Sequence, residues 1–164
     1  MPGGFLRMRR SGRLPGLTGL ILLWLATGVQ AGVEPAHLVT GFPRGQAVLV
    51  TNGPRCLRIE LYVASTAEQR AQGLMYVEVL PEFEGIYFGY GAPVEIAMWM
   101  KNTVLSLDML FIREDGAVGH IAQNTRPQST DRITSNGPVV GVLELGAGFA
   151  RRWHVEPGSR LLLF

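Results

Sequence analysis

Every second residue of the segment 57–63 is aliphatic, and polar or aromatic residues stand between the aliphatic ones. This period of two is typical of a strand with one buried face. The preceding segment 47–50 is also apolar, and Asn52-Gly53 lies between the two. Because Asn-Gly favours a tight turn, the pattern predicts a β-hairpin.

The period changes at residues 65–73, which predict a helix of two turns. Ser65 as N-cap and Glu68 three residues later form a capping box, and Gly73 ends the segment. A second short helix is predicted at 147–155. Further strands are predicted at 86–90, 95–100, 109–113, 118–121, 139–145 and 160–164, with a hairpin turn at 114–116. The chain is therefore expected to be mainly β, on the margin of α+β: a compact antiparallel barrel- or sandwich-like domain with one or two short helices.

The N-terminal residues predict export. A leader with four arginines precedes an uncharged apolar run at 17–26, and Val29-Gln30-Ala31 supplies the small residues of a cleavage site. We expect residues 1–31 to be a signal peptide, 32–46 an irregular arm, and 47–164 a single β-rich domain. The mature protein would be periplasmic or extracellular. It would contact a membrane only if the segment were retained as an anchor, although the run is shorter than the roughly 20 residues of a spanning helix.

The net charge of the chain becomes negative when residues 1–31 are left out of the count. Four of the 15 basic residues and none of the 13 acidic ones lie in residues 1–31, which leaves 11 basic and 13 acidic residues. This balance does not favour nucleic acid, which needs clustered Lys and Arg. Cys56 is the sole cysteine and is expected to be a small buried apolar residue. The glycines are scattered through turns and match no phosphate-binding or dinucleotide-binding motif, so no cofactor is predicted.

Three segments resemble a known family. AEQRAQGLMYVEVLP, then WMKNT followed by LDMLFI, and then VLEL followed by AG resemble, in order and spacing, the domain-of-unknown-function family numbered 192. The resemblance covers residues 58–164 and implies an exported protein with a compact β-rich body. The family often has Gly-Met-Leu-Phe where this chain has Gly85-Ile86-Tyr87-Phe88, which we expect to be a packing variant. The family's biochemical role is not established, so the resemblance implies no reaction.

Polar residues cluster unexpectedly in the apolar segment 98–108. If the segment is a strand, Trp99 and Lys101 share a face with Glu95, while Met98 and Met100 point the other way. Two interpretations remain open. Lys101 and Asp108 form a structural ion pair, with Asn102 closing the loop and Trp99 covering the core. Alternatively, Trp99, Lys101, Asn102 and Asp108 line a polar pocket that suits a small ligand or a glycan.

Glu144 stands between Leu143 and Leu145 and therefore points away from them. It is a candidate either for a salt bridge or for the rim of the same pocket. The chain is thus predicted to be a small-ligand or glycan-binding module. The alternatives are a hydrolase using Asp108 with Lys101 or Glu144, and a structural or partner-binding accessory protein of the envelope. Catalytic residues are not identified, and no metal site is predicted, since Met98 and Met100 are more typical of core packing than of Cu(I) binding.

Overall fold

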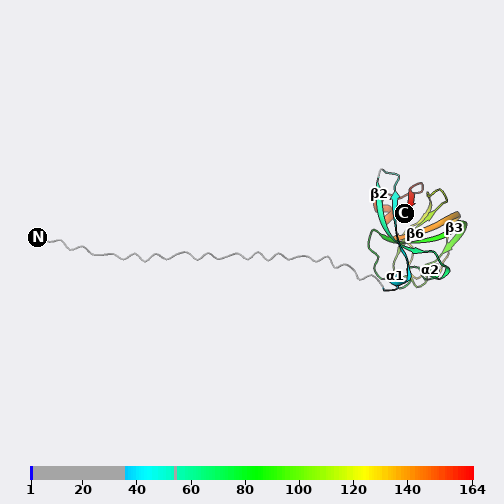
Figure 1. Cartoon of the computed structure of the whole chain (residues 1–164), viewed down its shortest axis with the longest axis horizontal. Coiled ribbons are helices and arrows are strands. Elements are labelled where there is room, and N and C mark those ends of the chain that lie inside the picture. Colours follow the sequence, from blue (N-terminus) through cyan, green and yellow to red (C-terminus); the bar gives the residue numbers. More distant parts are fainter. Residues whose placement is uncertain (2–35, 54) are drawn as a thin grey trace. The chain divides into compact units, whose positions relative to one another are not determined.

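The computed structural model describes Met1, residues 36–53 and residues 55–164. The predicted signal peptide and its cleavage site lie outside the described residues, apart from Met1. None of the helices within the described ranges is long and apolar enough to cross a membrane. The elements follow in the order α1 (Ala36–Gly41), β1 (Arg44–Val50), β2 (Cys56–Ala64), α2 (Ala67–Gln72), β3 (Glu84–Met98), β4 (Leu107–Ile112), β5 (Val118–Ala122), β6 (Ile133–Gly146), α3 (Phe149–Trp153) and β7 (Arg160–Leu163) (Figure 1).

The strands form one sheet in the order β5-β4-β6-β3-β2-β1-β7. All neighbours are antiparallel except β2 and β3, which run parallel because α2 carries the chain across between them. The sheet curls until its two edge strands approach each other. Val118 N donates to Ser159 O at 2.7 Å, and Leu161 N donates to Gly116 O at 2.8 Å. The predicted mainly β, barrel-like fold is therefore confirmed, as a curled half-barrel.

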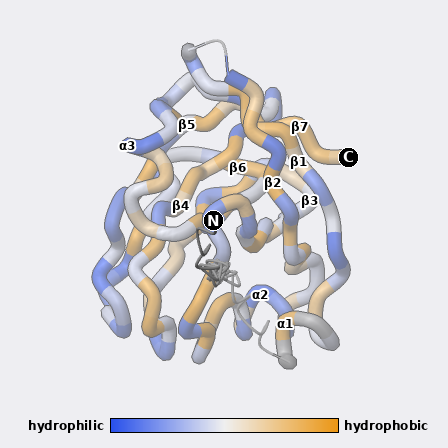
Figure 2. The backbone as a smooth tube through the Cα atoms, turned by 90° about the vertical axis from the view of Figure 1, so that its left-hand side faces the viewer, coloured by the Kyte–Doolittle hydropathy of each residue, from blue (hydrophilic) through white to orange (hydrophobic). Residues whose placement is uncertain are grey.

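Both predicted hairpins are present. Val50 pairs with Cys56 across the Asn52-Gly53 turn, and Ile112 pairs with Val118 across the turn at 114–116. Figure 2 shows hydrophobic positions following the strands and hydrophilic positions gathering at the turns. One expectation on this hairpin is wrong: Cys56 is exposed, because it lies on the opposite face of β2 from the buried Leu57.

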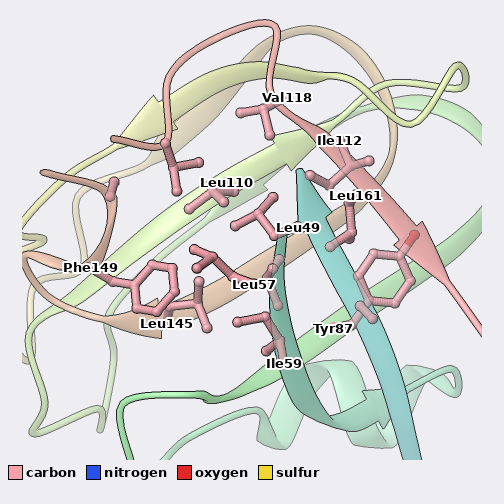
Figure 3. Close-up of a cluster of buried hydrophobic side chains, with 14 of the residues drawn as sticks. Leu49, Leu57, Ile59, Tyr87, Leu110, Ile112, Val118, Leu145, Phe149 and Leu161 are labelled. Carbon is pink, nitrogen blue, oxygen red and sulfur yellow. The ribbon is translucent and has the colours of Figure 1, made fainter. Parts of the chain in front are cut away.

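Hydrophobic side chains from all seven strands and α3 fill the inside of the curled sheet, where they point toward one another (Figure 3). This inner cluster contains Ala47, Leu49, Leu57, Ile59, Leu61, Tyr87, Leu110, Ile112, Val118, Leu143, Leu145, Phe149, Ala150, Val155 and Leu161. Within it, the ring of Tyr87 lies directly over Gly141, where a β-carbon would collide with the ring. Position 141 therefore has to be glycine for Tyr87 to pack against β6.

A second cluster lies on the other face of the sheet and includes Tyr62, Ile86, Phe88, Met100 and Phe111. Helices α1 and α2 lie next to each other in both views of the chain (Figures 1 and 2), and Gln69 Nε2 donates to Gly41 O at 2.9 Å. The prediction of an irregular arm is wrong for residues 36–46, which form α1 and the start of β1. Leu38 and Phe42 lie four residues apart and anchor this segment in the second cluster.

The predicted helix at 65–73 is present as α2, but its start differs by one residue. Thr66, and not Ser65, is the N-cap, and its capping box is completed by Gln69 in place of Glu68. Gly73 ends the helix as predicted, with φ +47. The second predicted helix, at 147–155, corresponds to α3. Because Gly73 and α2 border the site described next, this short helix fixes one of its walls.

Candidate functional site

A pocket of about 270 Å³ opens between α2, β3 and β6. One wall is α2 and the residues after it, from Arg70 to Met75. Another comprises Phe88 and Tyr90 of β3, together with the end of that strand and the residues just beyond it. The full lining is Arg70, Ala71, Gln72, Gly73, Leu74, Met75, Phe88, Tyr90, Ala97, Met98, Trp99, Lys101, Thr103 and Glu144. The volume is close to the lower end of the roughly 300–1,000 Å³ common for ligand pockets.

Glu144 is the buried acid of this pocket. The period of two in β6 sends Leu143 and Leu145 into the inner cluster and Glu144 to the opposite face, as predicted. Only 4% of its surface is exposed. Burial raises the pKa of the Glu144 carboxyl from 4.5 to about 8, and no described residue donates to it or pairs with it to oppose this shift. At neutral pH the carboxyl therefore keeps its proton and can donate a hydrogen bond.

Arg70 and Tyr90 form the polar wall beside Glu144. Arg70 Nη1 donates to Ser65 O at 2.6 Å and to Gly89 O at 3.1 Å, which holds the guanidinium 5.2 Å from the centre of the Tyr90 ring. Burial raises the pKa of Tyr90, the Arg70 charge opposes this shift, and Glu144 adds to it. Tyr90 thus stays an uncharged donor and acceptor well above neutral pH.

Trp99 and Lys101 follow directly after β3 and keep its alternation. Met100 between them is wholly buried, and its sulfur accepts from Thr125 Oγ1 at 3.2 Å. Trp99 is 52% exposed, and Lys101 Nζ lies 5.5 Å from the centre of the indole ring. The amine and the indole therefore lie together at the pocket, one as a cation and the other as an apolar surface.

Asp108 does not belong to the pocket. It is wholly buried, and each carboxylate oxygen accepts a backbone amide: Oδ1 from Asn124 at 2.8 Å and Oδ2 from Ala150 at 2.9 Å. Because Ala150 is the second residue of α3, Asp108 fixes the start of that helix. The predicted ion pair between Asp108 and Lys101 is wrong. Among the described residues no salt bridge joins these two side chains, and Lys101 is exposed.

Asn102 lies beside the pocket but outside its lining. Its backbone adopts the left-handed region with φ 59, its carbonyl accepts from Tyr76 N at 2.9 Å, and its Nδ2 lies 3.7 Å from Met75 Sδ. It therefore closes the loop, as one interpretation of the sequence proposed. Of the five residues predicted for a site, the structure gathers Trp99, Lys101 and Glu144 in one pocket and places Asn102 and Asp108 outside it.

Sequence analysis did not identify Arg70 and Tyr90 as residues of the site. Arg70 was placed on the helix at 65–73 and Tyr90 at the end of a predicted strand, with no pattern joining them to Trp99. Within residues 36–53 and 55–164, no group of three or more His, Cys, Asp and Glu side chains is arranged to hold a metal ion. The chemistry of the pocket therefore rests on one protonated acid, two cations and three aromatic rings.

Comparison with known families gives a match over residues 48–163, to a family described as uncharacterized ACR, DUF192. The chain belongs to the DUF192 family. Among curated proteins, none matches it. Two solved structures resemble this DUF192 protein along most of its length, and in both cases almost the whole of the other chain is covered.

The first is a putative transcription regulator from Sinorhizobium meliloti 1021, 40% identical, with a TM-score of 0.73, covering 74% of this chain and 95% of that one. The second is a protein of unknown function from Novosphingobium aromaticivorans DSM 12444, 30% identical, with a TM-score of 0.73, covering 80% and 94%. These similarities agree with the resemblance seen in the sequence. They establish family and fold for this DUF192 protein and leave its activity to be argued from the pocket.

Proposed function

We propose that this protein is an exported binding module that holds a small ligand, of the size of a single sugar ring, in the Glu144 pocket. The observation that carries the proposal is the state of Glu144. Glu144 is only 4% exposed, and its carboxyl has no hydrogen-bond or ion-pair partner among the described residues. Its oxygens are not sealed from the pocket, because Glu84 Oε2 is the one side-chain oxygen or nitrogen in the described ranges that is fully buried without a hydrogen-bond partner. Since folded proteins pair nearly all of their polar groups, a ligand with an oxygen atom beside Glu144 would supply this carboxyl with a hydrogen-bond partner.

The other lining residues suit a ring with apolar faces and polar edges. Phe88, Tyr90 and Trp99 offer aromatic surface, and Arg70 and Lys101 offer donors. Sugars combine an apolar ring face with hydroxyl edges, and aromatic side chains pack well against such faces. The basic leader, short apolar run and small residues before Gly32 support export, which would bring the pocket into contact with envelope sugars and small acids.

A hydrolase is supported less well. Glycosidases commonly use two carboxyl groups on either side of the scissile bond. Glu144 is the one carboxyl among the described lining residues, and Asp108 has both oxygens bound to backbone amides. The S. meliloti relative is named a putative transcription regulator, and regulation of transcription by contact with nucleic acid is therefore another candidate function. The balance of 11 basic and 13 acidic residues in 32–164 gives that function little support here.

A thermal-shift screen of monosaccharides and small acids tests the proposal. A ligand at 100 times its Kd adds about 2.7 kcal/mol to the free energy of unfolding, which raises Tm by several degrees. Ala71→Phe adds a ring to the pocket wall and should abolish the shift. Ala67→Phe adds the same ring to an exposed position of α2 outside the pocket lining, and should preserve it. If no compound stabilises the protein, or both variants respond alike, the pocket is not a ligand site.

A further inference from the structure

The pocket carries more positive than negative charge. Arg70 and Lys101 both line it, and neither forms an ion pair with any residue in the described ranges. Lys101 is also the only lysine in the whole sequence, since every other basic residue is an arginine. The acid nearest to Arg70 along the chain is Glu68. Its pKa is lowered first by a backbone hydrogen bond, then by Thr66 and last by the Arg70 charge, but Glu68 is exposed and does not line the pocket.

The lining acid does not balance these two cations at neutral pH. The pKa of Glu144 lies near 8 because the group is buried, so the carboxyl is largely protonated and uncharged. Tyr90, which lines the same pocket, is uncharged as well, because burial raises its pKa. An empty pocket of this composition attracts an anion and offers it a neutral O–H donor at the same time.

The position of Arg70 strengthens this preference. Its Nη1 donates hydrogen bonds to the carbonyls of Ser65 and Gly89, which fixes the plane of the guanidinium. Its Nε and Nη2 make no hydrogen bond with the described residues, so they remain available to an acceptor. Charge-assisted hydrogen bonds from a fixed guanidinium to a carboxylate are about twice as strong as neutral ones and are specific in geometry.

Building on the proposed function, we infer that the ligand is a small hydroxy-carboxylate of the size of a uronic acid. Its carboxylate is bound by Arg70 and Lys101, and one of its hydroxyl or ring oxygens accepts a hydrogen bond from the protonated carboxyl of Glu144. The aromatic rings of Tyr90 and Trp99 contact the apolar face of the same molecule.

Calorimetric titration with a matched pair of probes tests the charge requirement. Glucuronate carries the carboxylate, and glucuronamide has the same ring and hydroxyls with an uncharged amide. Glucuronate should bind about tenfold or more tightly than glucuronamide, and its advantage should shrink as salt is raised. Lys101→Met keeps the aliphatic stem and removes the charge, so it should reduce the advantage several-fold. Arg151→Met removes a cation from an exposed site outside the lining and should leave it unchanged.

The outcomes separate this inference from the proposed function. Equal binding of glucuronate and glucuronamide, or an unchanged advantage in Lys101→Met, would overturn the anionic ligand and leave a neutral-sugar module standing. Glucuronamide binding more tightly would have the same meaning. If neither probe binds and no other acid of the thermal-shift screen does, the anionic ligand is wrong. If the neutral sugars of the screen fail as well, the proposed function fails with it.

Discussion

Replacing Glu144 by glutamine should remove most of a steep loss of stability between pH 5 and pH 7.5. Glutamine has nearly the shape of a protonated glutamate but cannot ionise. In the wild-type protein Glu144 is buried in the pocket, and its pKa is raised from 4.5 to about 8. The other titratable groups that line the same pocket are Tyr90 on β3, Arg70 on α2 and Lys101 beyond β3. Tyr90 stays neutral over this pH range, because burial raises its pKa.

Stability falls with rising pH because the pKa of Glu144 is raised in the folded state. Because the folded state binds the proton more tightly than the unfolded state, the protein is most stable below pH 4.5, where both states are protonated. The free energy of unfolding then falls as pH rises from 4.5 to 8, by about 1.4 kcal/mol per unit at the steepest. Between pH 5 and pH 7.5 the loss from this one group is about 3 kcal/mol, and it levels off above pH 8.

Urea denaturation of both proteins at several pH values measures this loss. The difference in unfolding free energy between Glu144→Gln and wild type should move by about 3 kcal/mol in favour of the variant from pH 5 to pH 7.5. Glu156→Gln removes a carboxyl from the surface, and its pH dependence is subtracted as the control. A difference that moves by less than about 1 kcal/mol would refute the reasoning, because Glu144 would then ionise as it does in water.

Three further predictions follow from contacts outside the pocket or from the leader. Asp108→Ala should lower the free energy of unfolding by about 3–5 kcal/mol in urea, because the buried amide of Ala150 and the part-buried amide of Asn124 both lose their acceptor, while ligand binding stays intact in the folded fraction. Combined with Lys101→Met it should show no coupling, since the two side chains do not interact. Gly141→Ala should cost about 1–3 kcal/mol by collision with Tyr87, and Tyr87→Leu in the same chain should restore part of the loss. Mass spectrometry of protein from the cell envelope should find Gly32 at the N-terminus, and an intact Met1 in the membrane fraction would instead indicate an anchor.

Local patterns predicted most of the fold. The period of two in β2 and the Asn52-Gly53 turn contain enough information to place the first hairpin, and the same period places Glu144 opposite Leu143. The alternation in β2 also places Cys56 on the face opposite Leu57, Ile59 and Leu61, although a cysteine is usually buried. The one-residue error at α2 has a local cause as well. Ser65 and Thr66 can both cap, and Glu68 and Gln69 can both complete the box.

The site was harder to predict because its residues meet only in three dimensions. Asp108 and Lys101 are close in sequence, which suggested an ion pair. In the structure, the carboxylate of Asp108 instead accepts a hydrogen bond from the amide of Ala150, 42 residues further along the chain. Arg70 and Tyr90 reach the pocket because β2 and β3 are parallel neighbours with α2 between them. The periodicity of a single segment gives no information on such a crossing, so the polar wall of Arg70 and Tyr90 could not be found without the structure.

Tryptophan fluorescence tests the central claim, that the Glu144 pocket binds a small ligand beside Trp99. A compound that raises Tm in the screen is titrated into the wild-type protein, into Trp99→Phe and into Trp153→Phe. Because Trp99 is 52% exposed and lines the pocket, a ligand should change its emission. The change should saturate in the wild-type protein, persist in Trp153→Phe and disappear in Trp99→Phe. An emission change that survives in Trp99→Phe and is lost in Trp153→Phe would place the ligand elsewhere and contradict the account.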